Sequence, residues 1–164
     1  MEAIFVRGDN RRLLVILLLA IPASAQTADS ALLGRWTDGH ISSIQYQNSI
    51  TGATAPTNGR SFVYEFKADG TYSFTGLMQS VLYQCTTTMF SNETGTYTVS
   101  GDSVSLSPVK NPYRMTNSCA PSSNREAPGK LVPRSYRFRV DNARTLELHG
   151  DNGSVQKFSS NRKD

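Results

Sequence analysis

Residues 62–74 read FVYEFKADGTYSF. Aromatic side chains recur at every second position on both sides of Asp69 and Gly70, a dipeptide typical of tight hairpin turns. Alternation with period two places the aromatic residues on one face of a two-stranded ribbon and the polar residues on the other. The stretch therefore predicts a β-hairpin with a buried aromatic face.

The same alternation recurs along most of the chain after residue 60, whereas a sustained helical period is absent apart from a short stretch at 29–33. Ser, Asn and Pro dominate one segment, residues 108–133, which we expect to be irregular. Eight or nine short strands are predicted. Besides the hairpin, one opens with residues 32–36, and the others fall at residues 81–90, 96–100, 104–106, 135–140, 146–148 and 155–158.

Short turns in sequence order favour a meander, and a meander left open would expose two long edges to aggregation. Closing the sheet into a barrel removes both edges. A two-sheet sandwich is the alternative, but it usually needs Greek-key crossovers that are longer than these turns. We therefore predict an all-β protein with a single up-and-down barrel of about eight strands, whose interior is either packed solid or holds one small ligand.

The N-terminus has the order of a secretory signal peptide. Arg11 and Arg12 precede an apolar run at residues 13–21, and residues 23–25 are Ala-Ser-Ala. Nine apolar residues are too short to cross a bilayer as a helix. We expect cleavage after Ala25, which divides the chain into a signal peptide at 1–25 and one domain at 26–164, secreted or periplasmic and without a membrane span.

The full chain has a formal net charge of +4, and charged residues make up 18% of it. The signal segment contains three arginines and two acids, so the remainder carries +3. The positive charge is concentrated after residue 110, but the bases there are scattered. A solvated face explains them better than a nucleic-acid site, and we expect no nucleic-acid partner.

Cys85 and Cys119 are the only two cysteines. In an exported protein a lone pair of cysteines most often forms a disulfide. This bridge would tie the irregular segment to the sheet. A nucleophilic role would need a neighbouring base, and neither His40 nor His149 lies in a motif that supplies one.

Five aromatic residues on the predicted inner faces are candidates for lining a cavity. The alternative is that they fill a solid core, and the tyrosines favour a cavity because a buried hydroxyl needs a partner, which water or a ligand would supply. We find no catalytic motif, metal-ligand set or cofactor-binding loop, and we expect no cofactor or metal. The five candidates are Tyr64, Phe66, Tyr72, Phe74 and Tyr83.

Residues 32–36, LLGRW, open the first predicted strand, and they resemble the Gly-x-Trp signature of lipocalins and of bacterial lipocalin-like domains. The hairpin at 64–72 and the stretch GTYTVSGD at 95–102 are also similar to those small secreted barrels. The resemblance implies a ligand-binding barrel. It also implies that Gly34 lets the chain turn under the barrel and that Trp36 plugs its closed end.

We therefore expect a binding protein, not an enzyme, whose barrel takes a small, partly apolar or amphipathic molecule. The alternative is an envelope or inhibitor-type barrel that binds a protein partner through its loops, at residues 51–60 and around Cys119. A weaker hypothesis is an isomerase or hydrolase that uses the barrel as a cup. A cavity lined by the named aromatics would favour the small molecule, and a filled interior would favour the loops.

Overall fold

The computed structural model describes residues 30–39, 46–47, 54–55, 58–142 and 144–160. Within them the chain forms strands almost throughout, with one short 3-10 helix, η1 (Pro121–Ser123). The strands are β1 (Gly34–Asp38), β2 (Tyr46–Gln47), β3 (Thr54–Ala55), β4 (Gly59–Phe66), β5 (Thr71–Leu82), β6 (Cys85–Ser100), β7 (Ser103–Lys110), β8 (Pro112–Asn117), β9 (Arg125–Pro128), β10 (Arg134–Asp141), β11 (Thr145–His149) and β12 (Val155–Ser160).

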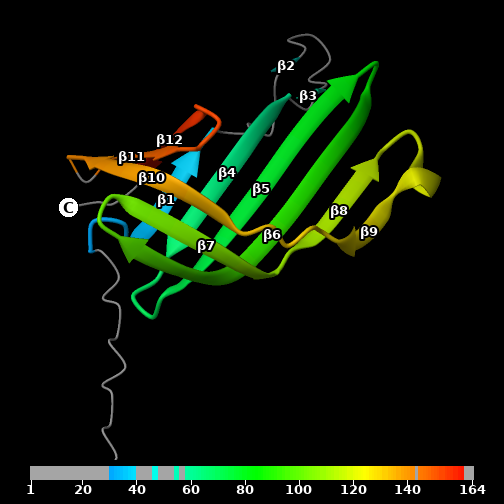
Figure 1. Cartoon of the computed structure of the whole chain (residues 1–164). Coiled ribbons are helices and arrows are strands. Elements are labelled where there is room, and N and C mark those ends of the chain that lie inside the picture. Colours follow the sequence, from blue (N-terminus) through cyan, green and yellow to red (C-terminus); the bar gives the residue numbers. More distant parts are fainter. Residues whose placement is uncertain (1–29, 40–45, 48–53, 56–57, 143, 161–164) are drawn as a thin grey trace, which may run out of the picture.

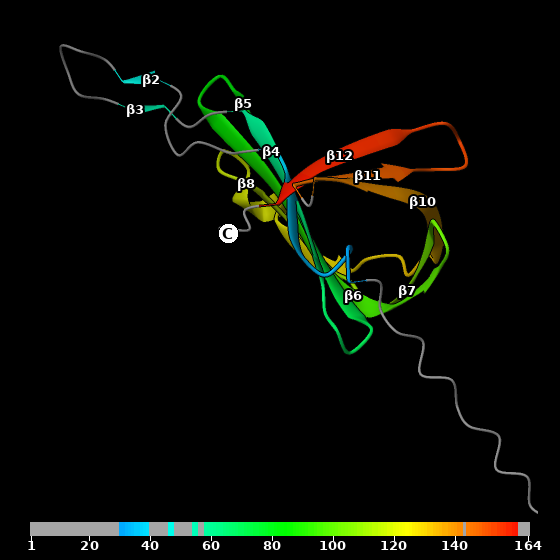
Figure 2. The same cartoon turned by 90° about the vertical axis from the view of Figure 1, so that its left-hand side faces the viewer.

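Eight of these strands close into an antiparallel barrel in the order β5-β4-β1-β12-β11-β10-β7-β6, and β6 pairs back onto β5. Figure 2 shows β7, β10, β11 and β12 curving round to face β4, β5 and β6. Neighbours in the barrel follow one another along the chain once the excursions β2–β3 and β8–β9 are set aside. The predicted up-and-down barrel is therefore confirmed, and the sandwich is not formed.

The aromatic hairpin is also confirmed. Tyr64 lies opposite Phe74, and Phe66 lies opposite Tyr72, across the β4–β5 ladder. The turn between them uses Gly70 at a φ of 79°, while Asp69 accepts hydrogen bonds from the amide and the hydroxyl of Thr71 at 2.9 and 2.6 Å. Because side chains alternate along a strand, the whole aromatic row turns into the barrel.

The residues that resemble a Gly-x-Trp motif lie at the start of β1. Gly34 has a φ of 112°, in the region that favours glycine. Trp36 is 1% exposed, and its indole Nε1 donates to the carbonyl of Leu32 at 2.8 Å. A buried indole N–H needs such a partner, so the turn before β1 positions Trp36 inside the barrel.

Strands β5 and β6 extend beyond the barrel and carry β8 and β9 with them (Figure 1). We call this extension the wing, formed by residues 76–82 of β5, residues 85–91 of β6, β8 and β9. The predicted strands at 81–90 and 96–100 were wrong in their bounds. The chain turns at Tyr83 and Gln84, within the first of them, and β6 then runs without interruption from Cys85 to Ser100.

The predicted disulfide is confirmed. Cys85 and Cys119 are joined, with their Cα atoms 5.3 Å apart. The segment 108–133 was expected to be irregular, but much of it forms the end of β7 and the hairpin β8–β9; Asn111, the hairpin tip at 118–124 and residues 129–133 lie outside strands. The bridge therefore ties one hairpin tip to another.

The predicted signal peptide at 1–25 lies outside the described residues. Among the residues that are described, no helix has the length and apolar character needed to cross a bilayer.

Candidate binding site at the barrel mouth

The barrel is filled at the end where β4 turns into β5, which we call the closed end. Its core residues are all at most 5% exposed. Aromatic rings pack directly on one another there, with the ring centroids of Phe66 and Tyr97 5.1 Å apart and those of Tyr64 and Phe158 5.3 Å apart. The core comprises Leu32, Trp36, Tyr64, Phe66, Tyr72, Tyr97, Val104, Leu106, Leu146, Leu148 and Phe158.

Three of the five residues expected to line a cavity therefore belong to the packed core. Tyr64, Phe66 and Tyr72 are each 2% exposed and line none of the cavities described below. Tyr83 is 91% exposed at the β5–β6 turn, so it does not lie on an inner wall. Of the five, only Phe74 lines the two cavities described below.

A buried ion pair lies between the core and the mouth. Glu93 is 2% exposed, and its Oε1 accepts hydrogen bonds from the hydroxyl of Tyr72 at 2.6 Å and from Nη2 of Arg134. A carboxylate taken out of water requires such partners. The Nε of Arg134 is also buried, and no group of the described residues accepts its proton. The tyrosine hydroxyl that was expected to face a ligand or water thus faces Glu93.

Burial raises the pKa of Tyr72 above its ordinary value, and the hydrogen bond to Glu93 raises it further. Burial also raises the pKa of Tyr64, with the neighbouring Tyr136 as the next cause. Both hydroxyls therefore stay protonated at neutral pH, so Tyr72 is a donor to the carboxylate.

Sequence reasoning missed Glu93 and Arg134. The strand period contained a signal, since Glu93 is in phase with Tyr97 on β6, and Arg134 is in phase with Tyr136 on β10. Arg137 and Arg139 alternate with the half-buried Tyr136 and Phe138 on β10, and both arginines are exposed on its outer face.

The barrel opens at its other end, which we call the mouth, because β1 is short. Asp38, its last residue, pairs with Phe62, whereas β4 continues to Gly59. On the other side, β1 pairs only with Ser159 and Ser160 of β12. Among the described residues, no strand pairs with the first residues of β12 on the side toward β4, and a cleft separates the two strands.

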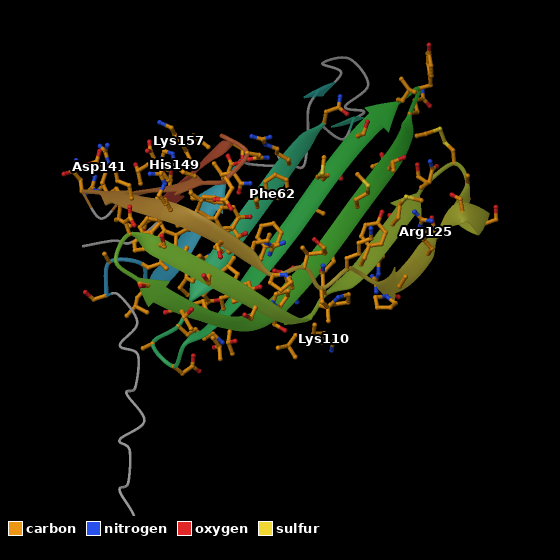
Figure 3. The ribbon with its side chains drawn as sticks, viewed as in Figure 1. Phe62, Lys110, Arg125, Asp141, His149 and Lys157 are labelled. Carbon is orange, nitrogen blue, oxygen red and sulfur yellow. A yellow bond between two sulfur atoms is a disulfide. The ribbon has the colours of Figure 1, made fainter. Side chains whose placement is uncertain are left out.

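This cleft is a cavity of about 500 Å³ with an aromatic floor and a charged rim; Figure 3 labels two of its residues, Phe62 and Lys157. Nη2 of Arg60 lies 3.4 Å from Oδ2 of Asp38, and its guanidinium lies 5.6 Å from the centre of the Phe62 ring. Nζ of Lys157 lies 2.7 Å from Glu147. The cavity is lined by Asp38, Arg60, Phe62, Phe74, Val155, Gln156 and Lys157.

A second, apolar cavity of about 150 Å³ lies on the wing side of the same two phenylalanines. The Phe62 and Phe74 rings are stacked, with centroids 6.0 Å apart. Gly76 keeps the space open, because a Cβ there would lie 2.9 Å from the Ser91 hydroxyl and 3.4 Å from the Phe74 ring. The lining comprises Phe62, Phe74, Gly76, Met78, Met89, Phe90, Ser91 and Tyr113.

Metal chemistry finds no support in the described residues, which contain no group of three or more His, Cys, Asp and Glu side chains placed to share an ion. His149 lies 3.2 Å from Glu147 on β11. His40, the other histidine, lies outside the described residues.

Comparison with known proteins adds no family assignment. No protein-family model matches the chain, and no curated protein matches it.

Proposed function

We propose that the protein binds a small amphipathic molecule at the barrel mouth. The observation that carries this proposal is the stacked pair Phe62 and Phe74, which borders both cavities. One side of the pair is apolar and reaches the methionines of the wing. The other side is rimmed by Arg60 and Lys157, with Asp38 as the single acid in that lining. A ligand with an apolar body and an acidic head group would place its body on the apolar side and its head group beside Arg60 and Lys157.

The resemblance to lipocalin-like barrels points to the same class of ligand, but it places the ligand deeper. The closed end has no room for it, because its aromatic residues fill the interior. The site proposed here therefore uses two half-buried phenylalanines at the rim, and the packed core beneath them acts as a rigid floor.

A fluorescent probe of this class, dansylaminoundecanoic acid, tests the proposal with the chain from residue 26 onward. Gly76→Val would fill the apolar cavity, and we expect it to weaken probe binding by at least about tenfold, the value of one well-buried side chain. Thr98→Val is the matched control, because Thr98 is exposed on the outer face of β6. Equal binding by wild type and Gly76→Val, at equal melting temperature, would refute the site.

The charged rim is tested separately. Arg60→Gln should weaken binding of the probe but leave binding of its methyl ester unchanged, because only the carboxylate needs the guanidinium. Arg137→Gln, an exposed arginine on the outer face of β10, is the control. A loss of the same size for acid and ester would show that Arg60 acts through packing alone.

The filled closed end favours a second candidate, a barrel that binds a protein through its loops and hairpin tips. One observation distinguishes the two. The mouth cavity should bind the probe in the small-molecule case, whereas a loop-binding module should bind no probe and lose its partner when residues 118–124 are changed.

A further inference from the structure

The far end of the wing contains no charged residue. The chain from residue 70 to residue 92 contains no Asp, Glu, Lys or Arg, and neither does the chain from 115 to 124. These two segments lie side by side, because β6 pairs with β8 and the Cys85–Cys119 disulfide joins their ends. Folding therefore brings together an uncharged surface from two distant parts of the sequence.

The turn between β5 and β6 forms this end, at the upper right of Figure 1. Two large apolar side chains are exposed there. Leu82 is 66% exposed and Tyr83 is 91% exposed. They form the β5–β6 turn with Gln84, and we call these three residues the wing tip. Scattered single apolar residues on a surface are ordinary, but two adjacent ones on an uncharged protrusion form a distinct feature.

The backbone of the wing tip is strained. Tyr83 and Gln84 have φ values of 47° and 69°, in the left-handed region. A two-residue turn of this kind favours Asn-Gly, and residues with larger side chains are disfavoured there. The ring of Tyr83 is 91% exposed, so burial within the described structure does not offset that strain.

The strained turn is nevertheless held firmly. The disulfide begins directly after it at Cys85, and two hydrogen bonds link the next residue to the neighbouring hairpin. Thr86 N donates to Ser118 Oγ at 2.8 Å, and Ser118 N donates to the carbonyl of Thr86 at 2.9 Å. An exposed aromatic side chain is thus presented on a rigid support, which lowers the entropy lost on binding.

We propose that the wing tip docks into the interfacial layer of a lipid membrane. Tyr is enriched where one end of a side chain meets apolar tails and the other meets water. Charged residues near the apex would resist insertion, and this surface has none. The convex shape of a hairpin tip also suits a fluid layer, which needs no complementary pocket.

The uncharged segment 115–124 is flanked by two arginines, Arg114 and Arg125. Arg114 is paired with Glu126 at 3.0 Å, which leaves Arg125 as the cation nearest the tip on this hairpin. Arg125 lies in one cross-strand row with Met78, Met89 and Met115, four residues behind Leu82. At the rise of a strand this places its backbone about 13 Å behind the apex. With the tip in the interfacial layer, Arg125 comes within reach of lipid phosphates, so anionic phospholipids are the preferred surface.

Flotation of the chain from residue 26 onward with phosphatidylcholine vesicles, with and without phosphatidylglycerol, tests the inference. The wild type should float with both and more strongly with phosphatidylglycerol. The variant Leu82→Ser/Tyr83→Ser should bind at least about tenfold more weakly. The control is Val109→Ser/Leu131→Ser, which changes two exposed apolar residues away from the tip, 69% and 50% exposed.

The inference fails if the wild type floats with neither vesicle, or if the serine variant floats as the wild type does. If the wild type binds no vesicles but binds a protein that the serine variant does not bind, the inference is also overturned, and the wing tip docks on a protein partner. A spectral readout supports the same decision, because Tyr83→Trp should show a blue-shifted emission on vesicle addition beyond that of the buried Trp36. None of these outcomes depends on the mouth site, which is tested by soluble probe alone.

Discussion

The closed end of the barrel and the wing are built from the same two strands, β5 and β6, yet they differ in what surrounds those strands. At the closed end, six further strands complete the ring, and aromatic residues fill the interior. In the wing, none of the described strands closes the sheet into a ring, and a disulfide at the tip joins the two hairpins. Closure into a ring therefore stabilises the barrel half of β5 and β6, whereas the wing half stays available for contact. The mouth, with Phe62 and Phe74, lies where the barrel passes into the wing.

The largest effect should come from the closed end. Trp36→Ala removes a 1% exposed indole and leaves a cavity, which should lower the free energy of unfolding by about 3–5 kcal/mol. Urea denaturation measures this change. Tyr83→Ala is the matched control in the wing, and we expect a change of less than about 0.5 kcal/mol because the ring is exposed. Similar losses of unfolding free energy from Trp36→Ala and Tyr83→Ala would show that the closed end and the wing do not differ in this way.

The buried ion pair should give the next effect. Arg134→Met leaves the carboxylate of Glu93 buried without its cation, which would cost about 3–5 kcal/mol in a fully buried pair. Arg134 is 31% exposed at its side chain, so solvent reduces the expected loss to about 2–3 kcal/mol. The double variant Glu93→Gln/Arg134→Met should recover part of that loss in urea denaturation. If the losses of unfolding free energy from Glu93→Gln and from Arg134→Met simply add up in the double variant, the two side chains are not paired.

Removing the disulfide should act on the wing. Cys85→Ala/Cys119→Ala should lower the free energy of unfolding by about 2 kcal/mol, the lower end of what a disulfide contributes, because β8 and β9 keep their pairing to β6 in the folded state. Amide hydrogen exchange separates the regions. Exchange should accelerate first in β8 and β9, while β4 and β11 retain their protection. Uniform acceleration throughout the chain would show that the wing and barrel unfold as one unit.

The smallest effect concerns alkaline pH. The pKa values of Tyr64 and Tyr72 are raised in the folded protein above the ordinary value of about 10. A raised folded pKa means that the stability from these groups is present below pH 10 and is lost as the pH rises above it. Absorbance near 295 nm should show Tyr64 and Tyr72 ionising only when the protein unfolds. Ionisation of all tyrosines near pH 10 in folded protein would contradict the buried cluster.

Sequence reasoning reached the barrel because strand alternation is a local signal, strongest in β4 and β5. It also reached the disulfide, since only one pairing was available. It missed β8 and β9 because Pro, Asn and Ser are typical of loops, and the pairing that makes them strands is with the distant β6. It missed the turn at Tyr83 because Tyr-Gln lacks the residues that favour left-handed φ values.

The candidate site was harder to predict for a physical reason. Alternation identifies which side chains point inward, but it does not say at which depth the interior stops being filled. Tyr64, Phe66 and Tyr72 point inward as expected and pack as core, while Phe74 points inward and borders open space. That boundary depends on the length of β1, which ends at Asp38, and no local pattern in the sequence gives it.

An NMR titration of ¹⁵N-labelled protein with dansylaminoundecanoic acid shows where the ligand binds, because it reports on the mouth and the closed end at once. We expect saturable shifts of the amides of Phe62, Phe74 and Gly76, with those of Phe66 and Tyr97 unchanged. Shifts centred on Phe66 and Tyr97 would place the ligand in the closed end. That result, or the absence of any saturable shift, would contradict a binding site at the mouth above a packed core.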